Sequence, residues 1–90
     1  MCAGMDTNPD AFLMVYARVL RRHRKDRGLS QEELAFRAGL SMRYVSLLES
    51  GKHQPSLATM KALADALETN LTAMIAEAEG DDQGERRLPE

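Results

Sequence analysis

The stretch LSQEELAFRAGLSMRYVSLLESGK, residues 29–52, decides the fold of this chain. Ser30 is followed three residues later by Glu33, the spacing of a capping box, so a helix begins here. Gly39 supplies the left-handed turn conformation that a residue with a Cβ resists, and Ser41 can cap the helix that follows. The stretch therefore predicts two short helices joined by a tight turn.

The second of these helices has two different faces. Val45 and Leu48 are three residues apart, so both point inward. The outward positions, by contrast, carry Arg43, Ser46 and Leu47. This mixture of charged, polar and apolar side chains indicates a surface that contacts a partner.

Helical periodicity extends along the rest of the chain, and no segment alternates like a strand. Pro9 can occupy the first turn of a long helix that ends at Gly28. Ser56 and Asn70 can cap two further helices, the last of which ends at Gly80. The sequence therefore predicts an all-α fold of five helices in one domain at residues 9–80, with disordered segments at 1–8 and 81–90, the second of them acidic.

Charge is segregated along the chain. The net charge of the 90 residues is −2, yet residues 11–61 hold ten Lys and Arg against four Asp and Glu, and the remainder holds two against ten. A cationic middle with acidic ends is typical of a small protein with a phosphate-binding face. Arginines on a helix are also often only a solvated face, so the pattern favours nucleic acid without establishing it.

Several function classes are excluded or disfavoured. A single cysteine, Cys2, permits no internal disulfide and no Cys metal cluster, and no cofactor or metal is expected. No apolar run approaches the roughly 18 residues of a membrane span, and no signal peptide is visible, which predicts a cytoplasmic protein without a membrane partner. The chain has no Ser/His/Asp set at usable spacing and no glycine-rich phosphate loop, so an enzyme is not expected.

Four residues match a known pattern at spacings of four, four and six: Gln31, Ala35, Gly39 and Val45. The pattern resembles the helix-turn-helix of the phage Cro and repressor-like family, often called XRE. The resemblance covers residues 16–75 and implies a five-helix lambda-repressor-like domain that binds double-stranded DNA. It also implies that the helix after Ser41 lies in the major groove as a recognition helix.

The same resemblance implies which residues contact DNA. Base contacts are implied at Met42, Arg43 and Leu47. Arg43 can bond guanine O6 and N7, whereas Met42 and Leu47 offer apolar contact to a thymine methyl or, alternatively, pack at the helix edge. Phosphate contacts are implied at Gln31, Tyr44, Ser46, Ser50 and Lys52. His53, which directly follows Lys52, could join them as a hydrogen-bond donor. Three arginines of the first helix are interpreted as a solvated or steering face: Arg18, Arg21 and Arg22.

Arg24 and Glu49 match a family pair that forms a partly buried, structural ion pair between the first and third helices. His23 and Glu68 depart from the family pattern, which usually has an apolar residue and a glycine there. No carboxylate cluster at ligand spacing accompanies His23, so a half-buried structural histidine is favoured over a metal ligand. At Glu68 the geometry of the turn stays open.

Two functions from different classes remain. The first is a sequence-specific transcriptional regulator, and the second is an antitoxin-like interaction module that binds a partner protein, with or without DNA binding of its own. A homodimer on a pseudo-palindromic site is expected, because one recognition helix spans too few base pairs to specify a genomic address. A candidate two-fold apolar patch, whose members could instead pack on each other within one chain, comprises Phe12, Val15, Val19, Met74 and Ile75.

Overall fold

The computed structural model describes residues 9–86, which form five α-helices. In chain order they are α1 (Pro9–Asp26), α2 (Gln31–Ala38), α3 (Met42–Glu49), α4 (Leu57–Ala66) and α5 (Leu71–Arg86). No strand occurs among these residues. The predicted all-α, five-helix fold is confirmed, whereas the segment 1–8, predicted to be disordered, lies outside the described residues.

Side-chain caps set where four of the helices begin, as the sequence predicts. The Ser30 hydroxyl accepts the Glu33 N–H at 3.0 Å, and the Glu33 carboxylate accepts the Ser30 N–H at 2.8 Å. At the start of α3 and α4 the side chains of Ser41 and Ser56 accept the N–H of the residue three positions later, without a reciprocal bond to their own N–H, and Asn70 accepts a backbone N–H in the first turn of α5. Each cap satisfies an N–H that has no partner within its own helix.

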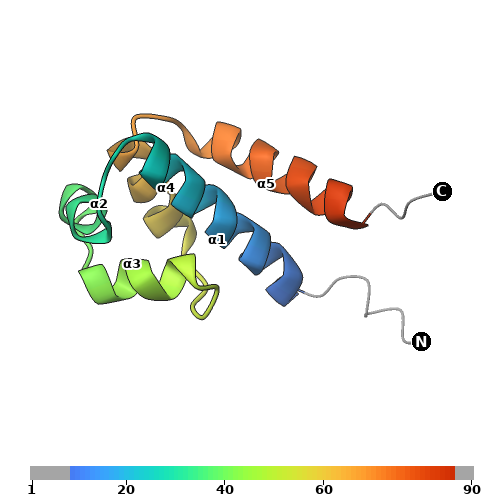
Figure 1. Ribbon diagram of the computed structural model, residues 1–90, viewed down its shortest axis with the longest axis horizontal. Helices are drawn as coiled ribbons and strands as arrows, with labels where there is room; N and C mark the ends of the chain where they lie inside the picture. Colours follow the sequence, from blue (N-terminus) through green and yellow to red (C-terminus); the bar gives the residue numbers. More distant parts are fainter. Residues whose placement is uncertain (1–8, 87–90) are drawn as a thin grey trace.

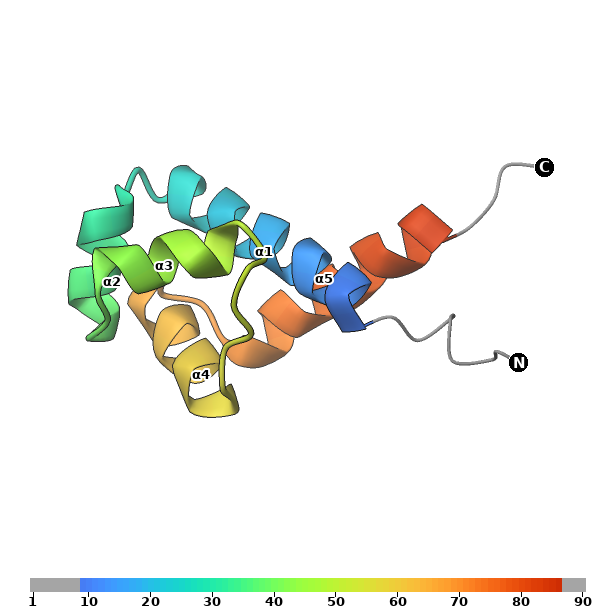
Figure 2. The ribbon, with the colours of Figure 1, turned by 90° about the horizontal axis from the view of Figure 1, so that it is seen from below.

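The helices are arranged so that α3 lies on the surface (Figures 1 and 2). Helices α1 and α5 run side by side in opposite directions, and α2 and α3 form the end of the molecule away from the last turns of α5 (Figure 1). Helix α3 packs on α1 and α2, and α4 packs on α2 and α5. One side of α3 is therefore covered by two helices while its other side stays open.

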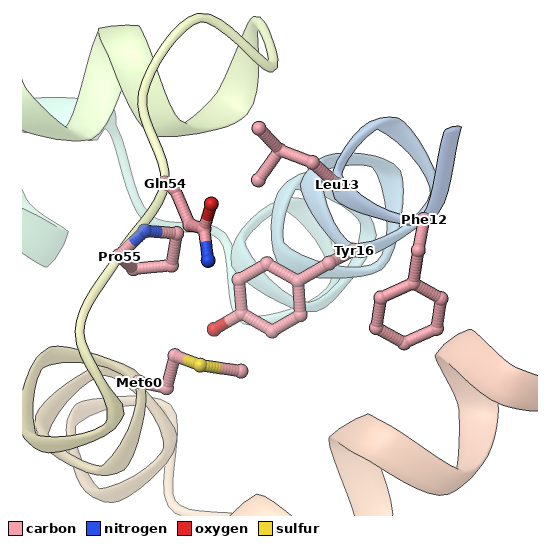
Figure 3. A pocket seen from close by; sticks show the side chains of 6 residues that line it. All are labelled: Phe12, Leu13, Tyr16, Gln54, Pro55 and Met60. Atoms are coloured by element: carbon pink, nitrogen blue, oxygen red, sulfur yellow. The ribbon is translucent and has the colours of Figure 1, made fainter. Parts of the chain in front are cut away.

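All five helices contribute to one hydrophobic core. Its fully buried side chains are Val15, Val19, Leu20, Leu34, Val45, Leu48, Leu63, Leu67 and Met74. Tyr16 of α1 is also buried, and it lies beside the segment that joins α3 to α4 (Figure 3). Val45 and Leu48 thus anchor the buried side of α3 in the core.

The proposed two-fold patch on α1 and α5 is wrong. Val15, Val19 and Met74 are at most 1% exposed, and Phe12 and Ile75 are partly buried against the same core. The reason is that α1 is covered by both α3 and α5, so its buried face is wider than the single stripe of an ordinary surface helix. The alternative, packing within one chain, is what the structure contains.

The predicted end of the last helix at Gly80 is also wrong, because α5 continues to Arg86. Gly80 does not adopt the left-handed conformation with which glycine ends a helix. Asp81, one residue later, is within 3.4 Å of Arg22 on α1. Residues 81–86 of the predicted disordered tail are therefore helical, and residues 87–90 lie outside the described part of the chain.

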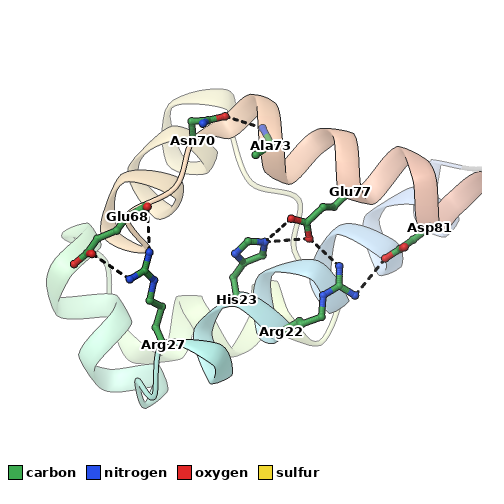
Figure 4. A network of polar contacts seen from close by, with 8 residues as sticks. All are labelled: Arg22, His23, Arg27, Glu68, Asn70, Ala73, Glu77 and Asp81. Atoms are coloured by element: carbon green, nitrogen blue, oxygen red, sulfur yellow. Dashed lines mark hydrogen bonds and ion pairs between the residues drawn. The ribbon is translucent and has the colours of Figure 1, made fainter.

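Polar contacts join α1 to α5 and to the turn before α5 (Figure 4). The Arg22 guanidinium donates to Glu77 at 2.9 Å, and His23 Nε2 lies 3.0 and 3.1 Å from the two oxygens of the same carboxylate. Arg27 donates to both the side chain and the backbone carbonyl of Glu68. Glu68 has φ 60°, so it adopts the conformation for which the family usually provides a glycine.

Candidate nucleic-acid interface

The turn between α2 and α3 has the geometry that the spacing of small residues predicts. Gly39 has φ 75°, and the N–H of Leu40 donates to the Ala35 carbonyl at 2.8 Å, which closes the end of α2. Ala35 is 2% exposed and Val45 is fully buried. A small residue on α2 and a branched one on α3 thus hold the two helices together and fix the direction of α3.

The three residues predicted to contact bases differ in exposure. Met42 is 53% exposed, and Arg43 beside it is exposed as well. Leu47 is only half-buried, one turn further along the open side of α3. The first turn of α3 therefore offers the most accessible side chains to a groove, and Leu47 offers a smaller apolar surface.

Four of the predicted phosphate contacts lie on the later part of α3 and on the segment after it. Ser46, Ser50 and Lys52 are exposed, and the Ser50 hydroxyl donates to the Leu47 carbonyl at 3.0 Å. His53 is exposed too, and its ring meets the Tyr44 ring edge to face, with centroids 5.0 Å apart. This contact holds His53 beside α3, so the ring nitrogens of His53 and the hydroxyl of Tyr44 lie on neighbouring parts of one surface.

An open depression of about 200 Å³ brings together residues of three helices. It is lined by Arg21 and Arg24 of α1, Gln31 of α2, Ser46 and Glu49 of α3, and Ser50. Arg21 is exposed, in agreement with its interpretation as part of a solvated face, and the depression also places it beside Gln31, which the sequence analysis did not predict. A usable signal existed, since Arg21 lies one helical turn before Arg24 and so shares the side of α1 that meets α3.

An ion pair between two of the residues that line this depression ties α1 to α3. Arg24 Nε donates to Glu49 at 2.6 Å, and a second guanidinium nitrogen donates to the other carboxylate oxygen at 3.0 Å. The side chains are 11% and 4% exposed. Arg24 also donates to the Leu29 carbonyl at 2.8 Å, and Gln31 Nε2 donates to Glu49 at 3.1 Å. The structure contains the predicted pair and adds Gln31 and the α1–α2 connection to it.

The electrostatics at the beginning of α2 do not favour an anion by themselves. The backbone N–H of Ser30 holds the pKa of the Glu33 carboxyl below its usual value, so Glu33 stays ionised at neutral pH. Glu32, in the same turn, adds another acidic group. The groups near the start of α2 that can attract a phosphate are therefore the Gln31 amide and cationic side chains such as Arg21, rather than the helix terminus.

Two further observations concern the described residues. They contain no group of three or more His, Cys, Asp or Glu side chains placed to hold a metal ion. None of their helices combines the length and the apolar character that a membrane span requires.

Comparison with known proteins gives consistent similarities. The family model described as "Helix-turn-helix" matches residues 20–73. A protein of Methanothermobacter thermautotrophicus described as an HTH-type transcriptional regulator is 45% identical over 49 residues, which are 54% of this chain and 71% of that protein.

Two solved structures are similar as well. The restriction-modification controller protein C.AhdI from Aeromonas hydrophila has a TM-score of 0.68 and 39% identity, covering 69% of this chain and 94% of that one. The clp gene regulator ClgR from Corynebacterium glutamicum has a TM-score of 0.78 and 27% identity, covering 82% and 79%.

Proposed function

This chain belongs to the helix-turn-helix family, and from that premise we propose that it is a transcriptional regulator that binds specific sequences of double-stranded DNA with α3 in the major groove. The observation that carries the proposal is the two-sided character of α3. Val45 and Leu48 are buried on α2 and α1, whereas Met42 and Arg43 are exposed at its first turn. A helix held this rigidly, with accessible side chains at its N-terminal end, is suited to reading base edges.

In this proposal the base contacts come from Met42, Arg43 and Leu47. Phosphate contacts position the domain, and they come from Gln31, Tyr44, Ser46, Ser50, Lys52 and His53. We add Arg21 to this set, because it lines the same depression as Gln31, Ser46 and Ser50. A guanidinium at this place supplies the cation that the acidic first turn of α2 lacks.

The protein acts as a homodimer on a pseudo-palindromic site in this proposal, although the patch on α1 and α5 does not provide the interface. Two copies are needed because one α3, a helix of eight residues, contacts only a few base pairs. Two copies of α3 are expected about 34 Å apart, one turn of DNA. The proposed function is binding without catalysis, and a DNA target agrees with the expectation of a cytoplasmic protein.

Selection from a pool of random duplexes tests the proposal. We expect enrichment of one sequence that forms two inverted half-sites, and sedimentation of the complex is expected to give two protein copies per duplex. Enrichment of no sequence, with equal affinity for all duplexes, would contradict sequence-specific binding. If the chain shows no sequence preference and a partner protein co-purifies tightly with it, the antitoxin-like alternative is favoured.

A further inference from the structure

The backbone just after α3 is in unusually close contact with α1. Gly51 directly follows Ser50, the C-cap of α3, and has φ 73°. The Met14 sulfur of α1 lies so close to Gly51 that an added Cβ would overlap it. At Gly39 and Gly80, by contrast, an added Cβ would meet nothing within 4 Å. Figure 2 shows the segment after α3 passing beside α1. Gly51 is therefore required by the approach of Met14 as well as by its own backbone conformation.

This contact lies among the candidate phosphate donors. Ser50 precedes Gly51, and Lys52 and His53 follow it. The N–H groups of Gly51 and Lys52 donate to carbonyls of α3 at 3.2 and 3.0 Å, which fixes the segment on α3. The Met14 thioether attaches the same segment to α1. Met14 is therefore a positioning residue for the backbone from which these three donors extend.

The Met14 side chain is also accessible to solvent. Met14 is 44% exposed, so its contact with Gly51 covers only part of it. Met60, by comparison, is partly buried, and Met74 is 0% exposed. A peroxide converts an accessible thioether into a sulfoxide, which is polar and carries an extra oxygen. On Met14 this oxygen either presses against Gly51 or turns the sulfur toward water, and in both cases the thioether contact is lost.

We propose that Met14 is a peroxide-sensitive modification site, and that its oxidation releases the segment after α3 and weakens DNA binding. A lone pair of the sulfur attacks one oxygen of hydrogen peroxide, the O–O bond breaks, and the other oxygen takes up the proton of the first and leaves as water. The sulfur loses two electrons, and the peroxide gains them. A methionine sulfoxide reductase reverses the change. The consequence for DNA rests on the proposed function, whereas the modification and the release of the segment do not.

The first experiment needs no DNA. The full chain is treated with hydrogen peroxide, peptide mass spectrometry locates the added oxygen, and NMR follows amide hydrogen exchange. We expect Met14 to be oxidised faster than Met74. Exchange at Gly51 and Lys52 is expected to rise about three- to tenfold, while exchange at Leu34 of α2 is unchanged.

The control for this experiment is Met14→Leu, which keeps an apolar side chain of similar size without the sulfur. The same peroxide treatment is expected to leave the exchange of Gly51, Lys52 and Leu34 in this variant unchanged. Oxidation of Met14 no faster than that of Met74 overturns the proposal. Unchanged exchange at Gly51 once Met14 is oxidised overturns it as well.

The second experiment measures the affinity for a scrambled duplex before and after peroxide treatment. This duplex offers phosphates without the selected bases, so oxidation of Met42, a candidate base contact, has little effect on its binding. We expect the affinity of the original chain to fall about three- to tenfold, and that of Met14→Leu to stay the same. Cys2 is present in both chains, so its oxidation contributes equally. Methionine sulfoxide reductase with dithiothreitol is expected to restore the affinity.

Three results of this experiment overturn the proposal. An equal fall in Met14→Leu assigns the effect to another residue, a fall that the reductase does not reverse assigns it to another lesion, and a loss of helical circular dichroism assigns it to general unfolding. Failure of the proposed function gives a different result. If the untreated chain binds neither duplex, DNA binding is refuted, and the amide exchange of Gly51 and Lys52 still decides whether oxidation of Met14 releases the segment.

Discussion

Gln31 and Glu49 are joined by a hydrogen bond from Gln31 Nε2 to the Glu49 carboxylate, 3.1 Å long, and that carboxylate is also paired with Arg24. One nearly buried acidic group therefore links the start of α2, the end of α3 and the last turn of α1. Gln31 Nε2 keeps a second proton, because an amide nitrogen has two. The contact orients Gln31 while leaving it able to donate to a phosphate.

The first prediction concerns the stability that Glu49 provides. In Glu49→Gln the Arg24 guanidinium loses its counter-charge in a site where it is only 11% exposed. We expect the free energy of unfolding to fall by about 3 kcal/mol, since breaking a buried pair leaves an uncompensated charge. Urea denaturation followed by circular dichroism measures the change.

The matched control is Glu68→Gln, which removes a carboxylate from an exposed pair with Arg27. Surface pairs contribute about 0.2 to 1 kcal/mol, so this variant is expected to remain close to the original stability. An equal loss of unfolding free energy in Glu49→Gln and Glu68→Gln would show that the buried ion pair stabilises the fold no more than the exposed one.

Much of the fold could be predicted from local signals, because those signals act locally. Ser30, Ser41 and Ser56 cap their helices as predicted, and each interaction spans three residues of the chain. Gly39 likewise requires only its own φ of 75°. Such features need no knowledge of distant contacts, and so the helix-turn-helix segment could be recognised from residues 29–52.

The wrong predictions depended on contacts between distant segments. Val15 and Val19 looked like a spare apolar flank because periodicity does not reveal how many helices cover α1. Gly80 looked like a helix end because nothing in the local sequence shows that Asp81 meets Arg22, 59 residues earlier. The depression that is lined by both Arg21 and Gln31 also depends on packing between distant segments, so local sequence does not reveal it. The assignment of individual DNA contacts stays a prediction.

The second prediction compares two glycines in opposite situations. Gly80 lies inside α5, and a Cβ there meets no atom within 4 Å, so Gly80→Ala is expected to stabilise the fold by about 0.5 to 1 kcal/mol. Gly39 has equally open surroundings but φ 75°, so Gly39→Ala is expected to destabilise it by about 1 to 2 kcal/mol. Urea unfolding of both variants measures the difference. If Gly80→Ala leaves the free energy of unfolding unchanged, α5 is frayed from residue 80 onward.

The third prediction concerns acid stability and Glu77. The hydrogen bond from Arg22, with further contributions from His23, holds the pKa of Glu77 below its usual value. A carboxyl with a depressed pKa in the folded state adds stability above about pH 4.5, its unfolded value, and this stability is lost as the pH falls through the folded pKa. The difference in stability between the original chain and Glu77→Gln should therefore shrink as the pH is lowered from about 5 to about 3.

The size of this effect is modest, because the Glu77 side chain is 39% exposed and water screens the pair. We expect at most about 1 kcal/mol at neutral pH, reduced further by 1 M salt. Thermal unfolding across the pH range measures it, with Glu79→Gln on the exposed side of α5 as the control. A difference that grows toward low pH has the wrong sign and would refute the assignment to Glu77.

The last prediction separates base contacts from phosphate contacts on the selected DNA site. Arg43 is exposed at the first turn of α3, so Arg43→Ala is expected to cost about 1 to 3 kcal/mol at that site and to relax the preference at one base position. Gln31→Ala removes a phosphate donor and is expected to weaken binding to all duplexes alike. Its fold should persist, because Glu49 keeps both hydrogen bonds from Arg24. Fluorescence anisotropy with the selected and a scrambled duplex measures both effects.

Lys61→Ala on α4 serves as the charge control, since Lys61 lies outside the candidate contacts and pairs with Asp65. If Arg43→Ala lowers the affinity for both duplexes equally, Arg43 binds a phosphate and base reading falls to Met42 and Leu47.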